Sequence, residues 1–181
     1  MPSYSCNAFA LAIQDAENML KHFNALNTKP PPPENEVLKR AGLIMAMTAW
    51  ETYVEDRVRE AATVRLSVLN DSAIGAFVTS KLKDEIKRLN NPNAEKTLQL
   101  FREYAGVDLE DKWCWNNFTA PQARERLNQL LKLRGDVVHR SRPFQPGPPV
   151  SHAVRKDELE KAIRFIKDLV SATENALSAA N

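Results

Sequence analysis

The chain has 181 residues, enough for one domain with a substantial hydrophobic core, and its 25 basic and 23 acidic residues leave a formal net charge of +2. A charge this mild neither requires nor excludes a nucleic-acid partner. Five glycines are few for the many tight turns of an all-β fold, and two distant cysteines, Cys6 and Cys114, exclude a disulfide framework and a zinc-ligand pattern. Residues 1–20 lack the basic start and long apolar run of a signal peptide, and no window is apolar enough to span a membrane. We therefore expect a cytoplasmic protein with no membrane partner.

Two long helices are predicted in the first part of the chain. Residues 5–26 place apolar side chains on one helical face, and the KPPPP run at 29–33 ends that helix because proline has no N–H to donate. A second helix is predicted to begin at residues 34–36, where acidic side chains suit the positive end of a helix, and it can extend to residue 69. Residues 41–50 (AGLIMAMTAW) are apolar almost all round, which predicts the centre of a bundle or a dimer interface.

The middle of the chain predicts two further helices and an irregular segment. Residues 74–89 have a helical apolar spacing that predicts a buried stripe of Ile74, Phe77, Val78, Leu82 and Ile86. The opposite face carries four basic side chains between residues 81 and 88, which either guide an RNA backbone or are simply solvated. Asn93 can cap a helix over residues 94–104. In the less regular stretch that follows, Trp113 and Trp115 either stack on bases or fill a core.

Two helices complete the chain. Thr119 and Pro121 suit the start of a helix that the proline-rich residues 141–149 terminate, and residues 156–177 form a last amphipathic helix. The sequence therefore predicts an all-α fold, an up-and-down helical bundle of about five to six helices. We expect one domain over residues 1–181, with proline-rich connectors at 29–33 and 143–149.

The stretch LKLRGDVVHR, residues 131–140, carries the main candidate site. Arg134 falls within an apolar stripe of the predicted helix formed by Leu127, Leu130, Leu131 and Val138. A guanidinium in such a place is costly unless it is paired, so Arg134 must reach solvent, find a carboxylate, or border a cavity or a second subunit. His139 lies about 140° further round the helix, on the flank of the same stripe. A bend at Gly135 or a symmetric dimer can bring the two side chains to one cleft.

Two carboxylates follow the apolar segment 41–50. Glu51 and Glu55 are four residues apart and share one helical face, so they can act as an acid–base pair or as metal ligands. They can also be satisfied by Arg57 and Arg59 of the same helix. A third interpretation makes Glu51 the counter-ion that holds Arg134 within its apolar stripe. Nothing else in the sequence has the spacing of a metal or cofactor motif, so we expect neither.

The basic setting of Arg134 favours an anionic partner. Lys132, Arg140 and Arg142 lie close by in the sequence and are candidates for binding an RNA backbone, although an ordinary solvated helix face has the same pattern. An imidazole such as that of His139 ordinarily titrates near ~6.5, so it can accept or donate a proton at neutral pH.

These residues resemble a known family. The segment from Arg134 to His139 looks like the Arg-x4–6-His motif of the HEPN superfamily of small helical domains, found in many prokaryotic ribonucleases and toxins. Residues 49–55 (AWETYVE) are similar to the Trp-Glu helix of the branch called RiboL-PSP-HEPN or MAE-like HEPN nucleases. The order of the predicted helices also fits, and the resemblance covers about residues 6–178.

The resemblance implies a metal-independent endoribonuclease in which a ribose 2′-OH attacks the adjacent phosphate and leaves a 2′,3′-cyclic phosphate. It implies that Arg134 holds the phosphate and that His139 transfers the proton, with Asp136 and Glu51 in support. It further implies a homodimer with a composite site, and a toxin or defence role with an antitoxin or a nucleotidyltransferase-type partner.

Two positions depart from the family pattern. The residue after the motif arginine is usually Asn, Asp or His, and here it is Gly135, with Asp136 one place later. Some toxin relatives carry a tyrosine, modified by a partner antitoxin, where this chain has Ser141. A non-catalytic RNA-binding or protein-interaction module with the same fold is therefore the alternative, and an adaptor bundle with no RNA role is a third.

Overall fold

The computed structural model describes residues 3–26, 28, 32–89, 92–139 and 154–180, with the side chains of Pro33 and His139 outside the description. Its helices are α1 (Tyr4–Leu26), α2 (Glu36–Arg65), α3 (Ala73–Lys87), α4 (Ala94–Leu100), α5 (Ala120–His139) and α6 (Lys156–Ala179). No strand forms in the described residues beyond an isolated bridge between Trp115 and Phe118. The all-α bundle predicted from the sequence is confirmed, while residues 29–31 of the first connector and all of the second, 143–149, fall outside the described residues.

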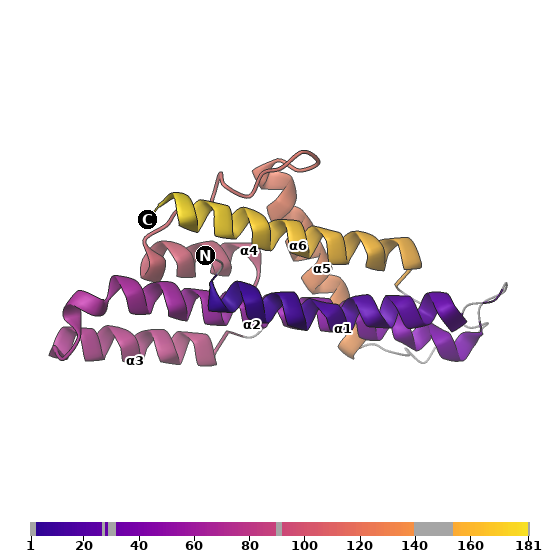
Figure 1. Ribbon diagram of the computed structural model, residues 1–181, viewed down its shortest axis with the longest axis horizontal. Coiled ribbons are helices and arrows are strands. Elements are labelled where there is room, and N and C mark those ends of the chain that lie inside the picture. Colours follow the sequence, from indigo (N-terminus) through magenta and orange to yellow (C-terminus); the bar gives the residue numbers. More distant parts are fainter. Residues whose placement is uncertain (1–2, 27, 29–31, 90–91, 140–153, 181) are drawn as a thin grey trace.

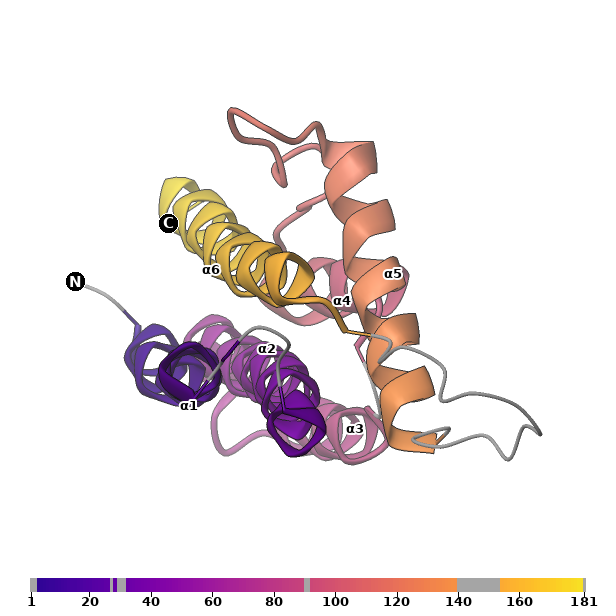
Figure 2. The same cartoon turned by 90° about the vertical axis from the view of Figure 1, so that its right-hand side faces the viewer.

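Helix α2 is the centre of the bundle, as its apolar composition predicts. It contacts α1, α5 and α6, and Figures 1 and 2 show α1, α2, α3 and α6 running lengthwise while α5 crosses them steeply. Within the apolar segment 41–50 only Met45 and Thr48 are exposed. The fully buried Trp50 packs against Tyr53 and Trp113, with ring centroids 5.9 and 6.0 Å away. This aromatic centre fixes the part of α2 that precedes the candidate carboxylates.

Helix α2 ends before residue 69, the furthest point to which the sequence predicted that it could extend. The α-helix stops at Arg65, and a 3-10 turn, Ser67–Leu69, continues to the end predicted for the helix. Asp71 then adopts a left-handed backbone with φ of 66°, which reverses the chain. Ser72 caps α3 by accepting a hydrogen bond from the Gly75 amide at 3.0 Å.

The buried stripe predicted for α3 is wrong at its first two positions. Leu82 and Ile86 are buried, but Ile74 and Phe77 are 66% and 63% exposed. The stripe that packs on the bundle runs through Gly75, where an added Cβ would lie 2.2 Å from the Leu69 carbonyl oxygen. Ile74 and Phe77 lie roughly 100° and 160° round the helix from Gly75 and so point away from it.

The helices after α3 begin as predicted. The Asn93 side chain accepts a hydrogen bond from the Lys96 amide at 2.8 Å and caps α4, which passes at Phe101 into a π-helical turn. At the start of α5 the Gln122 side chain accepts from both the Thr119 amide and hydroxyl at 2.9 Å, which is half of a capping box. No helix in the described part of the chain is both long enough and apolar enough to cross a membrane.

Candidate functional site

The α2 side of the candidate site is formed by Glu51, directly after the buried Trp50. Because Trp50 has no exposed surface and donates a hydrogen bond to the Pro92 carbonyl at 3.3 Å, this turn of α2 cannot rotate. The Glu51 side chain is 22% exposed, so it lies at the edge of the core rather than in open solvent. A carboxylate held in this way is available to a cation on a neighbouring helix.

That cation is on α5, which is held in place from two directions. Leu127 and Leu130 are buried in the core. The Asn128 side chain accepts from the Ala94 amide at 2.9 Å and donates to Glu95, which ties α5 to the start of α4. These contacts fix the rotation of α5 and therefore the direction of Arg134.

Arg134 and Glu51 form an ion pair between α5 and α2. Arg134 Nη2 lies 3.6 Å from Glu51 Oε2, and the arginine side chain is 26% exposed. The contact predicted for Glu51 as counter-ion of Arg134 is therefore present. The distance exceeds the 2.7–2.9 Å typical of a tight charge-assisted hydrogen bond. Arg134 Nε is buried and has no hydrogen-bond partner within the described residues. The guanidinium offers five N–H donors, so the ion pair holds it in place but does not use all of its donors.

Glu55 borders this pair one turn further along α2. Burial, and then the negative charge of Glu51, raises the pKa of the Glu55 carboxyl above its ordinary value. Arg57 and Arg59, proposed as satisfying this face, instead bind other carboxylates: Arg57 binds Glu174 at 2.8 Å, and Arg59 binds Asp56 at 2.7 Å. The described residues contain no group of three or more His, Cys, Asp or Glu side chains placed to hold a metal ion.

The apolar stripe around Arg134 closes on a different valine from the one predicted. Val137 is buried and Val138 is 45% exposed. Helix α5 crosses the other helices steeply (Figure 2). Val137 follows Leu130 by seven residues, about two turns, so both lie on the same buried side of α5.

The other predicted site residues on α5 lie away from the ion pair. Lys132 is exposed and Asp136 is half-buried. Each is two residues from Arg134 and therefore about 200° round the helix from it, so neither shares its face. Asp136 is three residues before His139, which makes the two positions neighbours on the helix surface. His139 ends α5, but its side chain lies outside the described structure, as do Arg140, Ser141 and Arg142.

Gly135 is not required by packing. A Cβ built at this position meets no atom within 4 Å. Because glycine replaces the polar residue that is usual in the family, the space next to Arg134 is open in the described structure. The sequence shows that position 135 is glycine, but only the structure shows that a larger side chain fits there.

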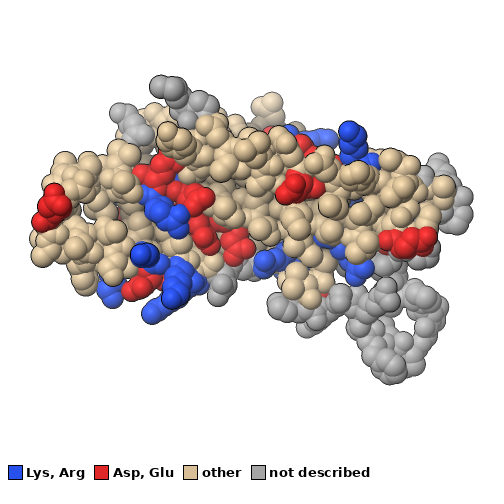
Figure 3. Space-filling model, turned by 60° about the horizontal axis from the view of Figure 1, so that its bottom comes forward, with Lys and Arg blue, Asp and Glu red and all other residues tan. Residues whose placement is uncertain are grey.

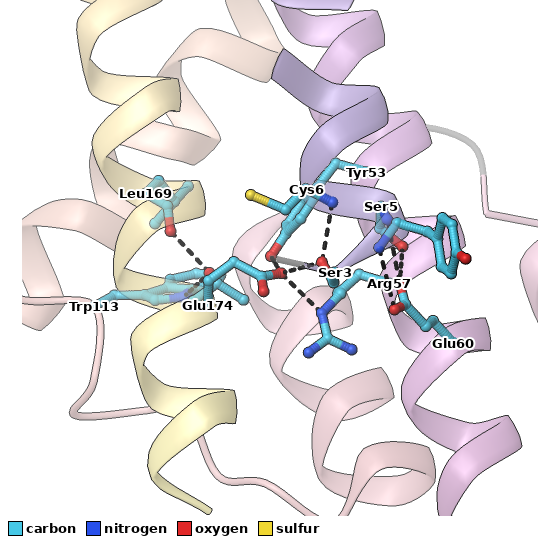
Figure 4. Close-up of polar contacts among 11 residues, drawn as sticks. Ser3, Ser5, Cys6, Tyr53, Arg57, Glu60, Trp113, Leu169 and Glu174 are labelled. Atoms are coloured by element: carbon cyan, nitrogen blue, oxygen red, sulfur yellow. Dashed lines mark hydrogen bonds and ion pairs between the residues drawn. The ribbon is translucent and has the colours of Figure 1, made fainter. Parts of the chain in front are cut away.

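A buried polar network on the opposite face of α2 from Glu51 was not predicted (Figure 4). Glu174 of α6 accepts hydrogen bonds from the Tyr53 hydroxyl at 2.7 Å, from Arg57 Nε at 2.8 Å and from the Ser3 hydroxyl at 3.2 Å. Burial, followed by the adjacent Glu174 carboxylate, raises the pKa of the Tyr53 hydroxyl well above its ordinary value, so it stays a donor. The sequence feature that could have indicated this network is the four-residue spacing of Tyr53 and Arg57, which places both side chains on one face of α2. The network joins α2, α6 and the start of α1.

The charged surface near α3 is mixed rather than uniformly basic. On the face shown in Figure 3, Lys and Arg side chains lie among Asp and Glu side chains. Lys81 lies 5.6 Å from the centre of the Phe77 ring, and Lys96 pairs with Glu85 at 3.0 Å. This distribution favours the solvated interpretation of the predicted basic face.

The fold and the site together define a class of protein: an all-α bundle that presents an arginine from its crossing helix to a carboxylate of its central helix. The family model described as RiboL-PSP-HEPN matches residues 11–179, and the chain belongs to this HEPN family. The resemblance seen in the sequence is thereby confirmed, and membership associates the chain with a nuclease or RNA-related function. No curated protein and no solved structure matches the chain.

Proposed function

We propose that the protein is a metal-independent endoribonuclease in which Arg134 binds the scissile phosphate and His139 transfers the proton. The observation that carries the proposal is the ion pair between Arg134 and Glu51. It holds a guanidinium at the edge of the core while leaving donors, including Nε, without a partner in the described residues. The planar fork of donors matches the geometry of a phosphate, as it does that of a carboxylate.

The chemistry requires no metal. The ribose 2′-oxygen attacks phosphorus, its proton passes to a base, and the bond from phosphorus to the 5′-oxygen breaks as that oxygen gains a proton. The products are a 2′,3′-cyclic phosphate and a 5′-hydroxyl. An imidazole at position 139 serves as base or acid, and Arg134 stabilises the charge that develops on the phosphate oxygens. Asp136, next to His139 on the helix surface, orients the ring, while Lys132, Arg140 and Arg142 hold neighbouring phosphates.

The first test is cleavage of mixed cellular RNA in the presence of EDTA. We expect wild-type protein to leave cyclic-phosphate ends, His139→Ala to lose cleavage while keeping its fold and RNA affinity, and the matched variant His22→Ala, at an exposed position of α1, to cleave normally. If wild type and His139→Ala behave identically, the alternative of a non-catalytic RNA-binding or interaction module replaces the nuclease.

A composite site between two copies is part of the proposal. Helix geometry separates Arg134 and His139 by about 140°, so one copy presents them in different directions. Mixing inactive Arg134→Ala with inactive His139→Ala should restore cleavage if one copy supplies the arginine and the other the histidine. Failure to restore activity, with a mixed dimer demonstrated by co-purification of differently tagged copies, would place both groups within one copy.

The biological setting completes the proposal and is supported by the family resemblance alone. We infer a toxin or defence role, controlled by an antitoxin or a nucleotidyltransferase-type partner. Induced expression should arrest growth with the wild-type chain and not with His139→Ala.

A further inference from the structure

A second cleft lies where α5, α6 and the turn at residues 115–118 meet. Its volume is about 610 Å³, within the range of ligand-binding pockets. Its lining includes two aromatic side chains, Trp115 and Phe118, together with Arg126 of α5 and Arg164 of α6. Its residues are separate from the ion pair of Arg134 and Glu51.

The aromatic wall of this cleft is rigid and partly open. Trp115 lies 5.2 Å from Phe118 and 5.7 Å from Phe165, and Phe118 lies 5.1 Å from Phe165, all between ring centroids. Reciprocal backbone hydrogen bonds between Trp115 and Phe118, at 3.0 and 2.8 Å, close the turn that carries them. Phe165 is buried beneath, whereas Trp115 and Phe118 are only half-buried. A rigid, half-exposed aromatic surface is a platform on which a planar base can stack.

The charges around the wall are mixed in sign. Asp157 is engaged by Arg155 and Lys161, at 3.7 and 3.3 Å. The remaining charged residues of the lining have no hydrogen bond or ion pair with the described part of the chain: Arg126, Arg164, Glu158 and Asp168. A bare phosphate placed here would face carboxylates as well as guanidinium groups. A nucleobase instead offers both acceptors for arginine and amino donors for a carboxylate on its edge.

The cleft is within reach of the candidate cleavage site along a common helix. Arg126 and Arg134 are both on α5, eight residues apart, which corresponds to about 12 Å along the axis and about 80° of rotation. Building on the proposed function, we propose that this cleft binds one unpaired nucleobase of single-stranded RNA, stacked on Trp115 and Phe118. Arg126, Arg164 and the free carboxylates contact the edge of the base. The cleft thereby selects single-stranded over double-stranded substrate.

Tryptophan fluorescence tests this proposal without requiring activity. Trp50 and Trp113 are fully buried, so Trp115 is the tryptophan that external ligands and quenchers can reach. Titrating His139→Ala protein with a short single-stranded RNA should quench the emission and protect it from acrylamide. A duplex of the same sequence should not. Unchanged emission at RNA concentrations that saturate binding would overturn the proposal.

Substitutions separate the cleft from the cleavage site. The double change Arg126→Gln with Arg164→Gln breaks no side-chain hydrogen bond or ion pair within the described structure. We expect it to weaken single-stranded RNA binding about tenfold and raise KM with little change in kcat. Trp115→Leu should do the same, and Arg102→Gln, an exposed arginine paired with acidic residues elsewhere, should do neither. If His139→Ala abolishes cleavage but the cleft variants leave it unchanged, the proposal for the cleft is refuted and the proposed nuclease activity stands. If RNA quenches Trp115 but the wild-type protein cleaves no RNA, the proposed nuclease activity is refuted and the proposal for the cleft stands.

Discussion

Replacing Glu51 with Gln isolates the contact on which the candidate site depends. Two unit charges at the observed 3.6 Å attract each other by roughly 4–5 kcal/mol at an effective dielectric constant of ~20. Partial exposure of both side chains, 26% and 22%, and the cost of removing them from water reduce the net value. We therefore expect a coupling free energy of about 1–2 kcal/mol between Glu51 and Arg134, intermediate between exposed and buried pairs.

A double-mutant cycle measures this coupling. Glu51 makes contacts besides the one with Arg134, so its single substitution removes more than the pair, and the cycle with Arg134→Gln subtracts those contacts. Urea unfolding at pH 7 gives the free energies, and the coupling should shrink as salt screens the charges. A coupling below about 0.3 kcal/mol would refute the reasoning, because that is the additivity expected of independent residues.

Glu55→Gln is the matched control for the same helix face. The pKa of Glu55 is raised by burial and by Glu51. The charged form is therefore disfavoured in the fold, and stability is lost as the pH rises through the range between the ordinary pKa and the folded one. Removing the charge should cost no stability at pH 7. RNA cleavage should also survive Glu55→Gln and fall with Glu51→Gln, because Glu51 and not Glu55 pairs with Arg134 in the described structure.

Three further outcomes follow from the structure. Gly135→Ala should stabilise the protein by about 0.5–1 kcal/mol in urea unfolding, since the helix gains a better former and the Cβ meets nothing within 4 Å. Thr173→Val, which leaves the buried Trp113 indole N–H without its 2.9 Å acceptor, should cost about 1–3 kcal/mol by the same method, and Thr173→Ser much less. Burial alone would raise the pKa of Glu60, but the Ser5 hydroxyl and nearby amides outweigh it and lower that pKa. Ser5→Ala should therefore destabilise the protein at pH 7, and the difference should vanish as the pH falls through the pKa of Glu60.

The parts of the fold that local chemistry determines were predicted from sequence. The cap at Asn93 depends on a side chain three residues from the amide it satisfies, so the sequence contains both partners. At Thr119 the start of the helix was predicted, but the side chain that accepts from the Thr119 amide is that of Gln122. The apolar segment around Trp50 was predicted to be central because a helix that is apolar all round has to be buried. Glu51 was one of several alternatives for Arg134, suggested because a guanidinium within an apolar stripe favours an anionic partner and Glu51 ends another buried segment; the structure contains this pair.

The features of the fold that were predicted wrongly or missed depend on how the helices cross. The buried faces of α3 and the end of α5 were assigned to the wrong residues, Ile74, Phe77 and Val138, because apolar spacing defines two adjacent stripes and only packing selects one. The Glu174 network was missed for a related reason. It joins residues more than a hundred positions apart, and no local pattern marks a carboxylate on α6 as the partner of Arg57 on α2.

The two ion pairs that opposite faces of α2 make with later helices show why one is suited to function and the other to stability. Glu174 Oε1 accepts three hydrogen bonds, its closest donors lie at 2.7 and 2.8 Å, and its arginine partner is nearly buried. The pair of Glu51 and Arg134 is longer, is more exposed and retains an arginine nitrogen without a partner among the described residues. Both pairs anchor α2 to a helix late in the chain, but Arg57 Nε donates to Glu174, whereas the buried Nε of Arg134 has no acceptor among the described residues. An incompletely satisfied arginine beside the open space at Gly135 retains donors that an entering phosphate can complete. The difference at the two Nε atoms, rather than in residue type, supports the proposal that Arg134 is the arginine that binds the RNA phosphate.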